Sequence, residues 1–304
     1  MTTQYKLTAE YKEIKFFYTT EDEGVEYEHK NDSGYYHKMD GPALVRSNGS
    51  EYWYKNGKLH REDGPASITK NSFQQITMVW YKDGEIHREN GPAYIVVSNN
   101  QEYMPGIGCE WYFKGKLHRV DGPAIDYMNL YKWYVNDILH REDGPAVEKL
   151  NKQKWYKNGK LHREDGPAYV FDDGERKIEK WYKDGKLHRD NDEPAVITSN
   201  CQEWYINGLR HRDNGFPAIC KKFNDGTEKY EWLVNGERHR EDGPAILNNN
   251  REEFYLENEL YSKNKFIELI KEKNKNSKNA ILDCTNICKD VSGIIADYLW
   301  SLTL

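Results

Sequence analysis

Eight histidines recur at a fixed distance from a tryptophan, and histidine is the side chain best suited to proton transfer or metal binding near neutral pH. In each copy the His lies seven residues after the Trp, and Arg follows the His directly. The clearest copy runs Trp-Tyr-Lys-Asn-Gly-Lys-Leu-His-Arg-Glu-Asp-Gly-Pro-Ala from Trp155 to Ala168. The histidines are His60, His87, His118, His140, His162, His188, His211 and His239, and the tryptophans are Trp53, Trp80, Trp111, Trp133, Trp155, Trp181, Trp204 and Trp232. Partial copies begin at His37 and at Phe254.

The spacing of these histidines argues against a shared metal site or a single active site. Histidines two or more strands apart would be ~10 Å apart at normal strand spacing, whereas metal–nitrogen bonds are about 2.1 Å long. An active site also needs one constellation rather than eight copies. We therefore expect no catalytic residue, no cofactor and no metal ion. Each His should pack on its paired Trp and bond to turn groups, and the Arg and Asp that follow should form an ion pair that braces the turn.

The tryptophans have a structural and a functional interpretation. The structural one is a ladder of Trp and His side chains that holds repeat on repeat. The functional one is an exposed aromatic stripe that binds an extended peptide or a glycan. A third interpretation, stacking of single-stranded nucleic acid on aromatic rings beside Lys and Arg, is opposed by the net charge of −6.

The residue types within each copy predict β-structure. Asn158-Gly159 is a strong signal for a two-residue hairpin turn, which would pair Lys157 with Lys160, Tyr156 with Leu161 and Trp155 with His162. A wider loop, in which only the Trp strand and the Ala strand pair, is the alternative. Asp-Gly-Pro predicts a second turn in which Gly frees the backbone, and Pro then stands at the start of the next strand.

Variation in repeat length is confined to one position. The step from the Ala of Pro-Ala to the next Trp varies between 9 and 18 positions, which predicts variable loops along one edge of an array. The loops expected above all to bind a partner are Ser67–Val79 and Tyr94–Glu110.

The fold predicted from these patterns is mostly β: an elongated, twisted antiparallel sheet of repeats with a small α-helical cap at the C-terminus. Residues 1–33 are expected to form capping strands, residues 34–261 an array of about nine or ten repeats, and residues 262–304 an α-helical segment.

The C-terminal segment combines two helical patterns. Ser262 should cap a helix that includes Phe266 and Ile270, and the Lys/Asn-rich stretch Lys271–Lys278 should be a solvated link. A second amphipathic helix follows, whose apolar stripe either caps the last sheet edge or docks to a partner. The candidate docking residues of that stripe are Ile287, Val291, Ile294, Tyr298 and Leu302.

Composition indicates a protein of a reducing compartment, with a cytoplasmic location. The five cysteines are odd in number and irregularly spaced, which is not the pattern of a disulfide framework. Cys284 and Cys288 are one helical turn apart and are expected to be core thiols rather than a metal pair. The chain opens with polar residues, and charges interrupt its apolar C-terminal end, so we expect neither a leader peptide nor a membrane span.

The block Trp-Tyr-x-Asn-Gly-Lys-x-His-Arg-x-Asp-Gly-Pro-Ala resembles the MORN repeat and its variants, with Pro-Ala where that family has Gly-x-Gly. The long His-Arg-Glu-Asp-Gly-Pro-Ala form is similar to uncharacterised repeat proteins of giant DNA viruses of the mimivirus kind. This resemblance implies a stacked antiparallel sheet, a role in protein or lipid contacts, no catalysis, and a location in the host cytoplasm or the virion. The stretch from Asp290 to Leu299 resembles F-box-like helices.

These patterns favour a non-enzymatic scaffold that binds protein partners through a sheet face and the variable loops. One alternative is a substrate adaptor that recruits a ubiquitin-ligase subunit through the C-terminal helix. Another is a lipid- or nucleic-acid-associated module, although nucleic acid is opposed by the charge. Self-association through the sheet edge or the C-terminal helix is also open.

Overall fold

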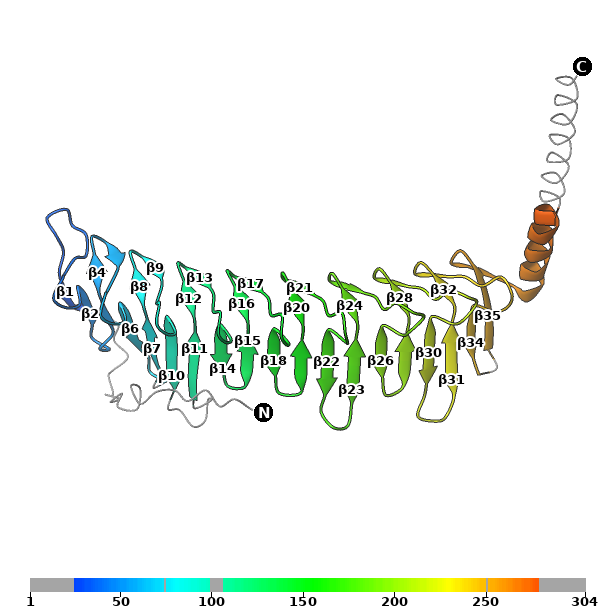
Figure 1. Cartoon of the computed structure of the whole chain (residues 1–304), viewed down its shortest axis with the longest axis horizontal. Helices are drawn as coiled ribbons and strands as arrows, with labels where there is room; N and C mark the ends of the chain where they lie inside the picture. Colours follow the sequence, from blue (N-terminus) through cyan, green and yellow to red (C-terminus); the bar gives the residue numbers. More distant parts are fainter. Residues whose placement is uncertain (1–24, 74, 99–105, 250, 279–304) are drawn as a thin grey trace, which may run out of the picture. The chain divides into compact units, whose positions relative to one another are not determined.

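A computed structural model of the chain describes residues 25–73, 75–98, 106–249 and 251–278. Two compact units, residues 1–173 and 174–304, divide the chain. Both consist almost entirely of antiparallel strands, and one helix follows the last strand (Figure 1). The predicted mostly-β antiparallel fold with a C-terminal helix is therefore confirmed.

The first unit is a sheet whose strands pair with their neighbours in chain order. Its strands are β1 (Val25–Glu28), β2 (Leu44–Arg46), β3 (Glu51–Tyr52), β6 (Ser67–Lys70), β7 (Gln75–Val79), β10 (Tyr94–Ser98), β11 (Gly106–Glu110), β14 (Ile125–Tyr127), β15 (Leu130–Lys132), β18 (Val147–Lys149), β19 (Lys152–Lys154) and β22 (Tyr169–Asp172).

The second unit repeats this plan. Its sheet strands are β23 (Lys177–Lys180), β26 (Val196–Thr198), β27 (Cys201–Glu203), β30 (Ile219–Lys222), β31 (Glu228–Glu231), β34 (Ile246–Asn248), β35 (Arg251–Leu256) and β36 (Glu259–Tyr261).

Each repeat also carries a short hairpin, and within each unit these hairpins follow one edge of the sheet (Figure 1). In the first unit they are β4 (Tyr54–Lys55) with β5 (Lys58–Leu59), β8 (Tyr81–Lys82) with β9 (Glu85–Ile86), β12 (Tyr112–Phe113) with β13 (Lys116–Leu117), β16 (Tyr134–Val135) with β17 (Ile138–Leu139), and β20 (Tyr156–Lys157) with β21 (Lys160–Leu161). In the second they are β24 (Tyr182–Lys183) with β25 (Lys186–Leu187), β28 (Tyr205–Ile206) with β29 (Leu209–Arg210), and β32 (Leu233–Val234) with β33 (Glu237–Arg238).

The hairpin register follows the prediction from Asn-Gly. Tyr156 pairs with Leu161 and Lys157 with Lys160, and the His162 N–H donates to the Trp155 carbonyl at 3.1 Å. Asn158 and Gly159 have φ values of 51° and 76°, as a two-residue turn that matches the twist of its strands requires.

The pairing between the Trp strand and the Ala strand, which was the alternative to the hairpin, forms in addition to it. The Trp N–H of each repeat donates to the Ala carbonyl thirteen or fourteen residues later, at 2.8 or 2.9 Å. One chain segment therefore runs from a sheet strand through the Trp into the hairpin. The Trp marks the point where the segment leaves the sheet ladder for the hairpin ladder.

Main-chain bonds also join each hairpin to the next. The Gly159 N–H donates to the Leu139 carbonyl at 2.8 Å, and the Arg141 N–H donates to the Tyr156 carbonyl at 3.2 Å. Equivalent bonds recur along both units. Because these bonds use main-chain groups, repeats stack in the same way even where their side chains differ.

The long spacers extend the sheet rather than form free loops. Ser67–Val79 was expected to be a loop, but it consists mainly of β6 and β7; Tyr94–Glu110 likewise supplies β10 and β11. The expectation was wrong because Ile, Val and Thr in these segments favour strands. Their buried Ile95, Val97 and Cys109 form the main apolar cluster of the first unit.

A helix covers residues 263–278. Ser262 caps it as predicted, since its Oγ accepts the Lys265 N–H at 3.4 Å, and Phe266 packs on Phe254 with ring centroids 5.0 Å apart. The prediction of a link over residues 271–278 was wrong: this stretch is helical because Lys and Glu are good helix formers and neither Gly nor Pro interrupts them. Within the part of the chain that the structure describes, no helix has both the length and the apolar character that spanning a bilayer requires.

The structure describes only part of the predicted N-terminal cap and of the predicted C-terminal segment. Residues 1–24 of the expected N-terminal cap, and residues 279–304 of the C-terminal segment, lie outside the described residues. The division at residues 33 and 262 stays a prediction.

Candidate functional site

The repeated histidines link consecutive repeats. In six of the eight repeats, and in the partial copy at His37, the His Nδ1 accepts a main-chain N–H from the hairpin turn of the following repeat, at 3.0 to 3.2 Å. His140, for example, accepts the N–H of Asn158. The opposite nitrogen, Nε2, faces the acidic residue two positions later, as in His60 with Glu62 at 3.1 Å and His211 with Asp213 at 2.9 Å. A neutral ring that accepts at Nδ1 and donates at Nε2 satisfies both contacts.

His118 departs from this pattern. Its Nδ1 is buried and has no hydrogen-bond partner within the described residues. Val120 stands where other repeats have an acidic residue, and the ring of Phe113 lies beside His118, with centroids 6.2 Å apart. The two histidine contacts therefore depend on the neighbouring residues of the repeat. His118, which lacks its Nδ1 bond, can serve as a control for the effect of that bond.

Each arginine that follows a histidine clamps the tryptophan of its own repeat. The guanidinium carbon lies 3.9 to 4.3 Å from the indole centroid in all eight repeats. In the repeat of Arg141, Nε donates to Asp143 at 2.8 Å and NH1 donates to the Pro145 carbonyl at 3.2 Å. The predicted Arg–Asp pair is present, and Arg rather than His packs on the Trp.

These ion pairs lower the pKa of the carboxylates. The hydrogen bond from Arg141 holds the pKa of Asp143 below its usual value, and Arg240 does the same for Asp242, against the opposing effect of burial. The carboxylates therefore stay charged at neutral pH and keep the guanidinium in place over the indole.

Glycine in Asp-Gly-Pro provides space rather than conformational freedom. A Cβ on Gly144 would lie 2.8 Å from the Arg141 guanidinium carbon, and one on Gly64 would lie 2.8 Å from that of Arg61. Neither glycine has a positive φ. The sequence-based explanation was therefore wrong: the guanidinium lies between the indole and this glycine.

The tryptophans do not form a bare aromatic stripe. Among the described residues no two indole rings stack on one another, and each is covered by its arginine. The Ala that pairs with each Trp has no exposed surface in any repeat. Trp and Ala thus alternate across the face that bears the histidines, called the Trp face below. The role of the Trp and His residues as a structural ladder stays a prediction, and this arrangement favours it.

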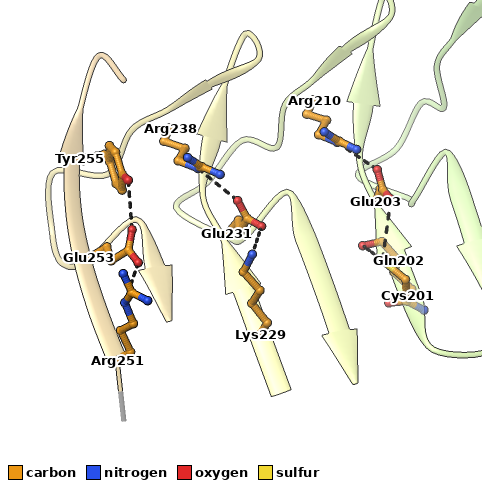
Figure 2. A network of polar contacts seen from close by, with 10 residues as sticks. All are labelled: Cys201, Gln202, Glu203, Arg210, Lys229, Glu231, Arg238, Arg251, Glu253 and Tyr255. Carbon is orange, nitrogen blue, oxygen red and sulfur yellow. Dashed lines mark hydrogen bonds and ion pairs between the residues drawn. The ribbon is translucent and has the colours of Figure 1, made fainter. Parts of the chain in front are cut away.

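The opposite face carries tyrosines and ion pairs. In the second unit Glu203 binds Arg210 at 3.0 Å, and Glu231 binds Arg238 at 3.2 Å and Lys229 at 2.6 Å (Figure 2). Arg210 and Arg238 occupy the hairpin position that holds Leu161 in the clearest copy. Burial, together with Glu203, raises the pKa of Tyr205 to about 12. These groups satisfy one another and leave no unpaired nucleophile or base in the network.

The remaining predicted sites give less information. The described cysteines Cys109, Cys201 and Cys220 are free, and burial raises the pKa of Cys109 to about 12 and that of Cys201 to about 11, so both thiols are protonated at neutral pH. In the described ranges no group of three His, Cys, Asp or Glu side chains is placed to hold a metal ion. Cys284, Cys288 and the docking candidates Ile287, Val291, Ile294, Tyr298 and Leu302 lie outside the described residues.

Sequence reasoning missed the exposed apolar residues of the Trp face. They stand mostly at repeat positions that are charged in other copies, two, five or nine residues after the Trp. A comparison of the copies, position by position, could have found them. They are Phe113, Val120, Val135 and Ile138 in the first unit, and Leu209, Phe216 and Val234 in the second.

A comparison of this chain with protein-family models and with curated proteins gives no match. The resemblance to MORN repeats and to giant-virus repeat proteins stays a prediction.

Proposed function

We propose that this chain is a non-enzymatic scaffold that binds protein partners through the Trp face and the turns between sheet strands. One observation carries the proposal. In most repeats the side chains that could do chemistry, His, Arg and Asp, make contacts within the array, as His140, Arg141 and Asp143 do, whereas the exposed residues differ between repeats. Repeat arrays combine a constant frame with a variable surface in this way.

The charge distribution supports a protein partner over nucleic acid. The Arg141 side chain is 21% exposed and that of its partner Asp143 is 83% exposed. Arginines in the other repeats are likewise tucked beneath outward carboxylates. Around these ion pairs the accessible charge is negative, whereas a phosphate backbone requires an accessible basic surface.

The test uses an exposed turn of the first unit. Replacing Asn71, Ser72 and Phe73 with Gly-Ser-Gly removes an exposed aromatic ring and keeps strands β6 and β7. We expect this variant to lose partners that the full chain captures in affinity purification with mass spectrometry. The matched control replaces Asn224, Asp225 and Gly226, an exposed turn of the second unit, in the same way. An unchanged set of partners in both variants would count against binding through the turns.

A substrate adaptor is the second candidate. Its support is the capped helix of residues 263–278, which Phe266 anchors on Phe254 of the last repeat, so that the chain beyond it starts from a fixed element. A chain truncated after Lys278 should lose a ubiquitin-ligase subunit and keep the partners of the array. If the same subunit is captured without residues 279–304, the adaptor role is wrong. A cytoplasmic location, in a host cell or otherwise, is a further part of the proposal that fractionation can test.

A further inference from the structure

Three exposed apolar residues of the second unit lie on the Trp face and are called the Phe216 patch below; two of them, Phe216 and Val234, line the same hollow. The three are Leu209, Phe216 and Val234, with 50%, 54% and 38% of their surface exposed. In the clearest repeat the positions of Val234 and Leu209 are held by Lys157 and Lys160. Phe216 stands in a turn that is one residue longer than the regular Asp-Gly-Pro turn.

A hollow of about 380 Å³ lies at this patch. Its lining includes Phe216, Trp232 and Val234, with His211 and Arg240 beside them. Ligand pockets span about 300–1,000 Å³, and the hollow, at the lower end of that range, has room for one large side chain. An aromatic side chain in a concave, partly apolar site is the usual centre of a protein interface.

The patch is held in place before any partner arrives. The Gly215 carbonyl accepts the Trp232 indole N–H at 2.7 Å, which fixes the longer turn to the next repeat. The Arg212 guanidinium lies 3.9 Å from the Trp204 centroid and 4.9 Å from that of Phe216. Two hydrogen bonds to Asp192, at 2.8 and 3.0 Å, hold that guanidinium. A fixed surface lowers the entropic cost of binding.

The charges around the hollow indicate a basic partner. The side chains of Asp213 and Asp242 are 67% and 70% exposed, whereas those of Arg212 and Arg240 are 16% and 19% exposed. The arginines are already paired with Asp192 and Asp242. A partner therefore meets carboxylates at the rim and apolar rings within it.

We propose that the Phe216 patch binds an extended protein segment that inserts one large apolar side chain into the hollow and places Lys or Arg beside Asp213 and Asp242. This inference rests on the proposed scaffold function and names the chemistry of one partner. The occupant is a peptide and not a nucleic acid, because the accessible charges at the rim are negative.

The experiment selects peptides from a random displayed library on the full chain and measures the selected peptides by fluorescence anisotropy. We expect sequences with a large apolar residue flanked by Lys or Arg. The triple variant Leu209→Lys, Phe216→Ser, Val234→Lys should bind them about tenfold more weakly or worse, as loss of a central anchor does. Lys is the residue of other repeats at two of these positions, so the variant should keep the circular dichroism and unfolding midpoint of the full chain.

Two further variants complete the design. Lys157→Ala with Lys160→Ala alters the same positions in a repeat that lacks the patch, and should leave affinity unchanged. Asp213→Asn keeps an acceptor for His211 and removes one rim charge, so it should weaken binding and flatten its salt dependence.

Unchanged binding in the triple variant, selected peptides without basic residues, or a failure to select any peptide would each overturn the inference. So would binding of a single-stranded oligonucleotide that the triple variant abolishes. None of these results decides the scaffold function, which the turn replacements test separately.

Discussion

The arginine of a repeat makes several contacts within that repeat at once, as Arg141 shows. It covers the indole, pairs with Asp and donates to the Pro carbonyl. Lys can supply the charge but not the planar fork that makes these contacts together. From the sequence, the neighbouring His was expected to pack on the Trp and the Arg to pair with Asp, whereas the Arg itself also lies over the indole.

Arg141→Lys should therefore destabilise the first unit. We expect the free energy of unfolding to fall by about 1–3 kcal/mol, because a cation–π contact and charge-assisted hydrogen bonds are lost. Urea unfolding of the full chain, followed by tryptophan fluorescence, measures this. The exposed Lys157→Met serves as control. An equal effect of the two changes would contradict the stabilising role of the Arg141 contacts.

Gly144→Ala should act through the same arginine. The added methyl group would displace the guanidinium from the indole, at a cost of about 1–3 kcal/mol, as for overpacking. In an Arg141→Met background the same change should cost much less. A double-mutant cycle of unfolding free energies measures this coupling, and strictly additive effects would show that Gly144 matters for another reason.

The histidines allow a comparison within one chain. His140→Leu leaves the turn N–H of Asn158 without its acceptor and should cost about 1 kcal/mol, whereas His140→Gln retains an acceptor and should cost less. His118→Leu should be close to neutral, because the Nδ1 of His118 is buried without a partner. Thermal unfolding of the three variants ranks them, and an equal loss at positions 118 and 140 would refute the role of the bond.

At the scale of single elements, Glu231 on strand β31 makes the stability of the second unit depend on pH. Burial raises the pKa of Glu231, but hydrogen bonds from Lys229 and Arg238 outweigh it, and the net pKa is lowered below 4.5. A depressed folded-state pKa contributes stability that is present above the unfolded pKa and is lost as pH falls through the folded pKa.

We therefore expect acid to destabilise the second unit, and Glu231→Gln to remove part of that sensitivity. At neutral pH the variant should be less stable by about 1 kcal/mol, as for a lost charged hydrogen bond. The difference between the two proteins should shrink as pH falls below the ordinary Glu pKa of about 4.3, and they should converge once pH is below the folded-state pKa. Urea midpoints measured across this range check the prediction, and parallel pH profiles would show that Glu231 does not titrate on unfolding.

The elements differ in how far the sequence predicts them. Asn158-Gly159 fixes its hairpin register locally, because both residues accept positive φ and the partners follow from the turn. Trp133 and Arg141 flank the hairpin of β16 and β17 and lie outside its strands, and neither the turn residues nor strand alternation predicts their stacking. β10 was taken for a loop because its length departs from the repeat, although its Ile-Val-Val run indicated a strand. Phe216 could be recognised only by comparing copies.

For the molecule as a whole, contacts between neighbouring repeats imply that a complete repeat can be removed. Deleting residues 133–154 joins Lys132 to Trp155, and the same Lys-Trp-Tyr sequence occurs at both ends of the deletion. β15 would then meet β22 with the register that β19 has now, since Lys132 pairs with Val147 as Lys154 pairs with Tyr169.

We expect this deletion to fold with a modest loss of stability, because each repeat depends only on its neighbours. Circular dichroism and urea unfolding measure it. Deleting residues 133–143 instead removes a hairpin without its Ala strand and should give an insoluble or unfolded chain. If both deletions behave alike, the array is not modular.

The bond from a His ring to an amide of the following turn, which most repeats make, has a consequence for synthesis on the ribosome. His60 accepts the Asp83 amide, so a repeat is completed only after its successor has left the exit tunnel. A nascent chain should consequently mature stepwise, with only its newest repeat unfinished at any moment. Limited proteolysis of arrested chains of increasing length would then show protection that advances by one repeat at a time.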